Sequence, residues 1–146
     1  MAAVLNKKAN SKVMLVDNRS IDNFVNAKII TRYQFADDVI VFTKAKKALK
    51  YLQDFNTTGI GEIPFALFLD LDMPDIDGFD FLNAFSLLSE KIKKCMKIIV
   101  ITNSYDHEAA ERCCKNDYVA AFFQKPLIKC NLEALELLLP ENFEAC

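Results

Sequence analysis

Histidine and regularly spaced cysteines, the usual ligands of a protein metal site, are nearly absent from this sequence. It contains one histidine, His107, which excludes a site built on several imidazoles. Its five cysteines are an odd number without a Cys-x-x-Cys spacing, so neither a structural zinc site nor a disulfide framework is expected. We expect reduced thiols, some of them core residues, as in a cytoplasmic protein.

Long apolar runs and an excess of basic residues are also missing. No run is long enough to cross a bilayer, and residues 1–12 lack the hydrophobic stretch of a signal peptide. We therefore expect a cytoplasmic protein without membrane insertion. The formal net charge of -2 argues against nucleic acid binding through phosphates as the main activity. A composition of 52% hydrophobic and 26% charged residues over 146 residues fits one globular domain.

The sequence does contain a regular alternation of apolar strand-like runs and helical periods. Five strands are predicted, at Val13–Val16, Val39–Phe42, Phe65–Leu69, Ile98–Ile101 and Val119–Phe123. Apolar residues at helical spacing follow each of them, at Ile21–Ile29, Ala45–Leu52, Phe81–Ile92, Ala109–Cys113 and Leu132–Leu139. Five strand–helix units predict an α/β fold, a doubly wound five-stranded parallel sheet with helices on both faces and right-handed crossovers.

Local signals refine this pattern. Ser20 and Thr43 are predicted N-caps of the first two helices, and a later helix begins near Asp106. In the first helix, Ile21, Phe24, Val25 and Ile29 share one apolar face. The segment Asn56–Glu62 has two glycines and is predicted to be a loop.

The ends of the chain look different from its middle. Residues 1–11 are predicted to form a loose N-terminal arm, and residues 141–146 a C-terminal tail. Residues 12–140 then make up the single domain.

Polar residues stand where four of the predicted strands end. They are Asp17 with Asn18, Asp70, Thr102 and Lys125. In a parallel sheet the carboxyl ends of all strands lie at one edge, so these side chains are expected to converge there. Each one alone could be a cap or a surface residue, but four at successive strand ends indicate a site.

Phosphoryl transfer is the chemistry that these groups suggest. A carboxylate such as Asp70 can act as a nucleophile and form an aspartyl phosphate. Mg²⁺ prefers oxygen ligands, which Asp17 and Asp70 could supply. The hydroxyl of Thr102 and the ammonium of Lys125 could contact the remaining phosphoryl oxygens.

This constellation resembles the receiver domain of two-component response regulators over nearly the whole chain, from about Lys12 to Leu139. The matching pieces are Val16-Asp17-Asn18, Asp70-Leu71-Asp72-Met73-Pro74, Asp77-Gly78, Thr102 and Phe122-Phe123-Gln124-Lys125-Pro126. The resemblance implies the flavodoxin-like (βα)5 receiver fold with strand order 2-1-3-4-5. Because no effector domain follows, a stand-alone receiver is expected.

The resemblance also implies a role for each matching residue. Asp70 would accept a phosphoryl group, and Mg²⁺ would be held by the side chains of Asp17 and Asp70 and the backbone carbonyl of Asp72. Thr102 and Lys125 would contact the phosphoryl group.

Partners and the output switch follow from the same resemblance. The phosphoryl donor would be a phosphohistidine on a sensor histidine kinase or a histidine phosphotransfer protein, and the signal would pass to an unknown downstream protein. Phe122 has the position of the aromatic switch residue. The Lys125-Pro126 bond is expected to be cis.

One position departs from the family pattern. The second of two adjacent acidic residues after the first strand, normally a direct Mg²⁺ ligand, is Asn18 here. An amide carbonyl can still coordinate Mg²⁺ but brings no charge, so a weakened metal site is expected. A pseudo-receiver that is never phosphorylated and acts only as an interaction module is one alternative.

Two further alternatives would change the class of the protein. Asp70-Leu71-Asp72 also resembles the nucleophile motif of haloacid-dehalogenase-type phosphatases, but it lies in mid-chain and is followed by Pro74 where a threonine or valine is usual. A flavin-binding protein of similar topology is disfavoured, because Asp17-Asn18-Arg19 does not form a phosphate loop. The receiver interpretation makes the protein a signalling domain and not an enzyme beyond its own phosphorylation and dephosphorylation.

Overall fold

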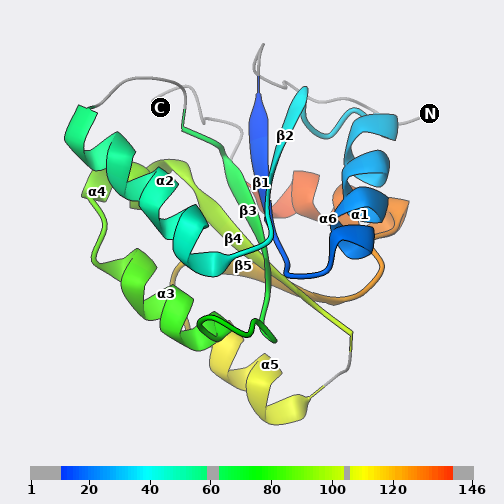
Figure 1. Cartoon of the computed structure of the whole chain (residues 1–146). Coiled ribbons are helices and arrows are strands. Elements are labelled where there is room, and N and C mark those ends of the chain that lie inside the picture. Colours follow the sequence, from blue (N-terminus) through cyan, green and yellow to red (C-terminus); the bar gives the residue numbers. More distant parts are fainter. Residues whose placement is uncertain (1–10, 59–62, 104–105, 140–146) are drawn as a thin grey trace.

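The computed structural model describes residues 11–58, 63–103 and 106–139, and within them five parallel strands form one sheet (Figure 1). The strand order is β2-β1-β3-β4-β5, which confirms the prediction. The strands are β1 (Lys12–Val16), β2 (Asp38–Phe42), β3 (Ala66–Asp70), β4 (Lys97–Thr102) and β5 (Val119–Gln124). The predicted arm and tail lie almost wholly outside the described residues, as do Gly59 and Gly61.

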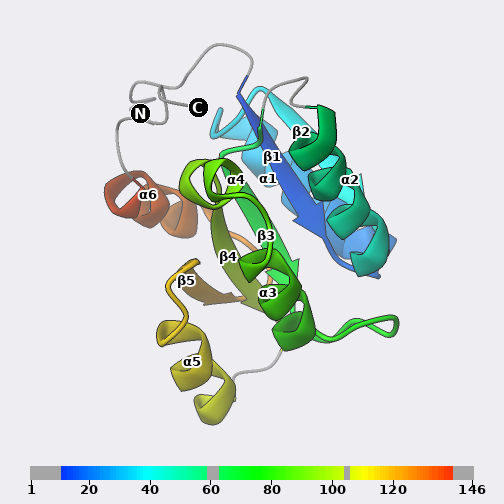
Figure 2. The same cartoon turned by 90° about the vertical axis from the view of Figure 1, so that its left-hand side faces the viewer.

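Within the described ranges, six helices cover the two faces of the sheet (Figures 1 and 2). On one face lie α2 (Ala45–Thr58), α3 (Gly78–Ser86), α4 (Glu90–Cys95) and α5 (His107–Cys114), and on the other lie α1 (Ser20–Arg32) and α6 (Lys129–Leu138). None of the helices in these ranges is both long and apolar enough to cross a membrane.

Alternating side chains of the strands build two separate cores. Val16 and Leu69 pack under α2 and α3, whereas Leu15 and Phe68 pack under α1 and α6. This is the two-residue period of a strand that is buried on both faces. It explains why β1, β3 and β4 are continuous apolar runs, and why polar residues can appear only where these strands end.

The first helix buries the face opposite to the one expected. Ile21 and Phe24 are each 60% exposed, while Asn23, Asn26 and Ile30 are buried. The two asparagines are buried because each makes a hydrogen bond to the chain beside the strand ends. Asn23 Nδ2 donates to the Asp17 carbonyl at 2.8 Å, and Asn26 Oδ1 accepts from the Leu127 amide at 3.3 Å.

Several predicted boundaries also change. The single helix expected over Phe81–Ile92 is two helices, because Leu87 and Leu88 leave the helix and Ser89 caps α4 by accepting from the Ile92 amide. The residue Asn56 lies in α2 and not in a loop. The prediction of a helix entry at Asp106 is confirmed, since its side chain caps α5.

Both predicted caps of the first two helices are wrong. Ser20 is already the first residue of α1. The second helix is capped from a distance, because the amide of Lys46 donates to Asp75 Oδ2 at 2.9 Å. Hydrogen bonds from backbone amides lower the pKa of Asp75 despite its partial desolvation.

The cysteines differ in one case from the expected reduced state. Cys113, Cys114 and Cys130 are free, whereas Cys95 is disulfide-bonded. The buried thiol of Cys113 contacts the core, and burial raises its pKa to about 11.

Candidate functional site

The polar residues predicted at the strand ends lie at one edge of the sheet. Asp70 is the last residue of β3, and Asp17 directly follows the neighbouring strand β1. Both carboxylates are almost completely buried, as is Thr102 at the end of β4. These three residues lie at or directly after the ends of the three central strands, which have neighbours on both sides, so their side chains are surrounded by protein.

Lys125 joins this group from the loop after β5. Its Nζ forms a hydrogen-bonded ion pair with Asp17 Oδ2 and lies 3.7 Å from Asp70 Oδ1. The Lys125 amide donates to the Thr102 carbonyl at 2.7 Å, and the Lys125-Pro126 peptide bond is cis, as expected. The lysine is therefore anchored at both ends, through its backbone to β4 and through its ammonium to β1.

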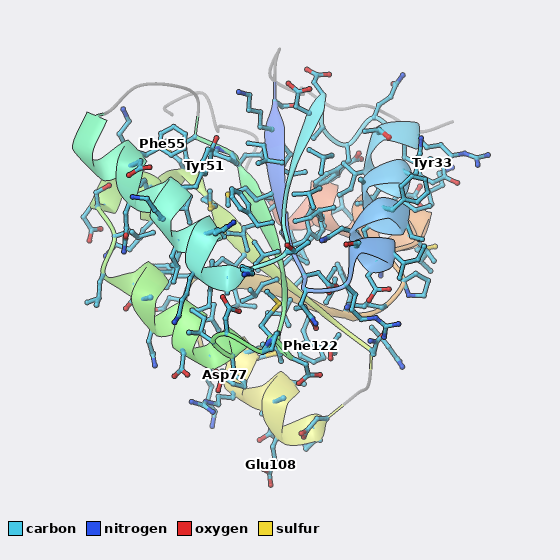
Figure 3. The ribbon with its side chains drawn as sticks, in the orientation of Figure 1. Tyr33, Tyr51, Phe55, Asp77, Glu108 and Phe122 are labelled. Carbon is cyan, nitrogen blue, oxygen red and sulfur yellow. The ribbon has the colours of Figure 1, made fainter. Side chains whose placement is uncertain are left out.

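The loop between β3 and α3 is shaped by the Asp77-Gly78 pair. Asp77 caps α3 by accepting from the Asp80 amide at 2.9 Å, and its place at the start of that helix is visible in Figure 3. A Cβ on Gly78 would lie 2.4 Å from Leu71 Cδ2 and 2.8 Å from Leu71 Cα. Only glycine therefore allows this close approach, which is secured by a hydrogen bond from the Gly78 amide to the Leu71 carbonyl at 2.9 Å.

The remaining predicted site residues lie at the rim. Asn18 and Asp72 are both exposed, in contrast to Asp17 and Asp70. The backbone amide of Asp72 nevertheless donates a hydrogen bond to the Asp70 carboxylate and helps to hold its charge.

Phe122 lies on β5, two strands away from Asp70 on β3. It is half-buried on β5 beside Val100, and it packs against the core under α2 and α3 (Figure 3). The register pairs Thr102 with Gln124, two residues further along β5. Phe122 therefore lies beside the strand of Thr102, at the level of a residue two positions before Thr102.

Electrostatics set Asp70 apart from an ordinary carboxylate. Desolvation by burial is the main cause that raises its pKa to about 6, and the charge of Asp17 adds to the effect while the charge of Lys125 opposes it. Burial alone would lower the pKa of Lys125, but hydrogen bonds with Asp17 and Asp22 and the charge of Asp70 raise it overall. Asp70 is therefore ionised at neutral pH, with a higher basicity than an exposed aspartate.

Three residues of α1 also support this edge and were not predicted from the sequence, namely Asp22, Asn23 and Asn26. Asp22 Oδ2 lies 2.9 Å from Lys125 Nζ. The signal that could have found them is the helical spacing of these polar residues, which places them together on the side of α1 opposite Ile21 and Phe24.

The oxygen atoms at this edge are the candidate ligands of a metal ion. Among the residues that the structure describes, no group of three or more His, Cys, Asp and Glu side chains has the arrangement of a metal site. Two buried carboxylates, Asp17 and Asp70, do lie together at the sheet edge. Mg²⁺ is commonly bound through one or two carboxylates and several waters, so the donor chemistry fits this ion.

Solved structures with the same fold are numerous. A two component response regulator from Cytophaga hutchinsonii has a TM-score of 0.80 and 23% identity, with 89% of this chain and 96% of that chain covered. A response regulator receiver protein from Dyadobacter fermentans has a TM-score of 0.77 and 25% identity, with 89% and 98% covered. The Mn(2+)-bound form of response regulator Rcp1 has a TM-score of 0.67 and 18% identity, with 86% and 88% covered. No curated protein sequence matches.

The family model described as the response regulator receiver domain matches residues 13–135, from β1 to the middle of α6. This range contains all of the sheet except its first residue, Lys12, and every residue of the strand-end edge. The chain therefore belongs to the response regulator receiver domain family.

Proposed function

We propose that this receiver domain accepts a phosphoryl group on Asp70 and changes conformation in response. The observation that carries the proposal is the position of Asp70, which is buried at the end of β3 with the ammonium of Lys125 3.7 Å from its Oδ1. A nucleophilic carboxylate and a fixed positive charge beside it are what in-line phosphoryl transfer needs from a protein.

The transfer can be written through the residues present. A carboxylate oxygen of Asp70 attacks the phosphorus of a phosphohistidine, the P–N bond breaks, and the electron pair leaves with the imidazole, which takes a proton from solvent. Lys125 neutralises charge on the phosphoryl oxygens, and the Thr102 hydroxyl donates a hydrogen bond to one of them. Water later attacks the aspartyl phosphate, releases inorganic phosphate and restores the carboxylate.

Mg²⁺ is the cofactor that we propose for this site. Asp17, Asp70, the Asp72 carbonyl and the Asn18 amide would hold it, and when bound it would neutralise phosphoryl charge. The proposal is supported by the two buried carboxylates and by the Mn(2+)-bound form of the related response regulator Rcp1. Asn18 is neutral, so we expect weaker metal binding than an aspartate at this position would give.

The donor would be a sensor histidine kinase or a histidine phosphotransfer protein in the cytoplasm, and the output would go to a further protein. The switch would link Thr102 to Phe122, because both belong to the β4–β5 pair. Phosphorylation would act by favouring one of two accessible conformations. The domain would thus be a signalling switch, with no catalysis beyond its own phosphorylation and dephosphorylation.

Acetyl phosphate with Mg²⁺ tests the proposal directly. Intact-mass spectrometry should find one phosphoryl group on the wild-type protein and none on Asp70→Asn. Loss of the label with hydroxylamine would identify an acyl phosphate. Absence of the label from the wild type, at any Mg²⁺ concentration and with beryllofluoride also without effect on the NMR signals of Thr102 and Phe122, would leave the pseudo-receiver as the better description.

A further inference from the structure

A second carboxylate holds Lys125 from the side of α1. Lys125 Nζ lies 2.9 Å from Asp22 Oδ2 and is also hydrogen-bonded to Asp17. An ammonium has three donors, so two are engaged by these aspartates. At 3.7 Å, Asp70 Oδ1 is beyond hydrogen-bonding distance from the same nitrogen.

The position of Asp22 on α1 makes this contact a property of the fold. Asp22 lies in the first turn of the helix, and the burial of Asn23 and Asn26 fixes the rotation of that helix. The Lys125 side chain is 5% exposed and that of Asp22 is 22% exposed. The carboxylate of Asp22 therefore reaches from the surface to a buried ammonium.

Asp22 and Lys125 also share the wall of a surface pocket. Its lining is formed by Asp22, Val25, Asn26, Asn103, Lys125 and Pro126. An exposed cation, Arg19, lies on the outer side, with its Nε 3.7 Å from Asp22 Oδ2. Asp22 thus adds a negative charge where an anionic phosphoryl donor would approach Lys125 from this pocket.

We infer that Asp22 is a positioning residue that holds the Lys125 ammonium toward α1 and thereby slows the loading of Asp70 with a phosphoryl group. The inference rests on the proposed function. Three carboxylates, Asp17, Asp22 and Asp70, surround one ammonium, and the two that are hydrogen-bonded to it oppose its movement toward phosphoryl oxygens at Asp70. Removing the charge of Asp22 weakens its hold on the ammonium and reduces repulsion of the incoming dianion.

The test compares Asp22→Asn with two matched variants. Asp22→Glu keeps the charge, and Asp54→Asn makes the same charge change at an exposed position of α2. The readout is the initial rate of phosphorylation by acetyl phosphate, with circular dichroism to verify folding. Asp22→Asn should be about three- to tenfold faster than wild type, and this gain should shrink as ionic strength rises.

The controls decide between this role and a general charge effect. Asp54→Asn should match the wild type, and Asp22→Glu should stay below Asp22→Asn. A rate for Asp22→Asn that equals or falls below that of the wild type, or that Asp54→Asn reproduces, overturns the inference.

A second measurement does not depend on phosphorylation. The ¹⁵Nζ and ¹³Cε chemical shifts of Lys125, recorded at one pH without any phosphodonor, should change in Asp22→Asn and stay unchanged in Asp54→Asn, because only the first variant alters a carboxylate that is hydrogen-bonded to this ammonium. Unchanged shifts in Asp22→Asn would overturn the holding role even if phosphorylation occurs. A wild type that takes no label, together with changed Lys125 shifts in Asp22→Asn, would refute the proposed function and leave this contact established.

Discussion

The burial of Asp70 predicts that this residue destabilises the fold at neutral pH. Its pKa is raised from 3.8 to about 6 in the folded protein, mainly by desolvation. A carboxyl whose pKa is higher in the folded state than in the unfolded state binds its proton more tightly when the protein is folded. The contribution of Asp70 to the free energy of unfolding therefore falls as pH rises from about 4 to about 6. At neutral pH the cost of keeping the buried carboxylate ionised is then fully present.

The free energy of this destabilisation follows from the size of the pKa shift. A difference of about two pKa units, at 1.36 kcal/mol per unit, corresponds to about 3 kcal/mol. Asparagine has a similar shape without the charge, but it also weakens the attraction to Lys125. We therefore expect Asp70→Asn to raise the free energy of unfolding by about 1–3 kcal/mol at pH 7.5, and by almost nothing below pH 4.

Urea unfolding of both proteins between pH 3.5 and pH 8, with a chelator present, measures this difference. Asp54→Asn serves as the control for loss of an exposed charge, and its effect should be small throughout. A destabilised Asp70→Asn at pH 7.5, or a gain that is the same at every pH, would refute the reasoning.

Three further predictions concern the loops around the site and the nucleophile. Gly78→Ala should lower stability by about 1–3 kcal/mol in urea unfolding, because its Cβ would overlap Leu71; an unchanged midpoint would contradict the close packing. Asn26→Ala should cost about 1–3 kcal/mol by leaving the buried amide of Leu127 without its acceptor, and faster hydrogen exchange at that amide should accompany it. The rate at which acetyl phosphate labels Asp70 should rise with pH around about 6 and level off above it, and a flat profile would count against an ionised nucleophile.

The strand-end edge could be predicted from the sequence because parallel strands impose it. Apolar runs that end in Asp17, Asp70 and Thr102 reveal both the sheet and the place where its polar groups meet. Lys125 could be assigned to the same edge because it follows the apolar run of the last strand and precedes a proline. These inferences need only the local pattern and the geometry of a parallel sheet.

The first helix shows where such reasoning fails. The apolar face with Ile21 and Phe24 is exposed, since the asparagines on the opposite side make the hydrogen bonds that position the loops after β1 and β5. Hydrophobic periodicity cannot detect a helix that is oriented by polar contacts. For the same reason Asp22 was not recognised as a neighbour of Lys125, more than a hundred residues away.

The helix expected over Phe81–Ile92 failed for a different reason. Its apolar residues at helical spacing do enter one core, but Leu87 between them is exposed, and the chain turns there before a new helix begins after Ser89. The spacing of apolar residues indicates which side chains are buried. Two short helices on the same face of the sheet can bury the same residues as one longer helix.

The alternation of side chains along β5 has a consequence for how a signal would spread. Phe122 belongs to the core under α2 and α3, while its neighbour Phe123 belongs to the core under α1 and α6. A reorientation of Phe122 would therefore act first on the packing under α2 and α3. A partner that binds on the α3 and α5 side would thus be placed to sense the orientation of Phe122.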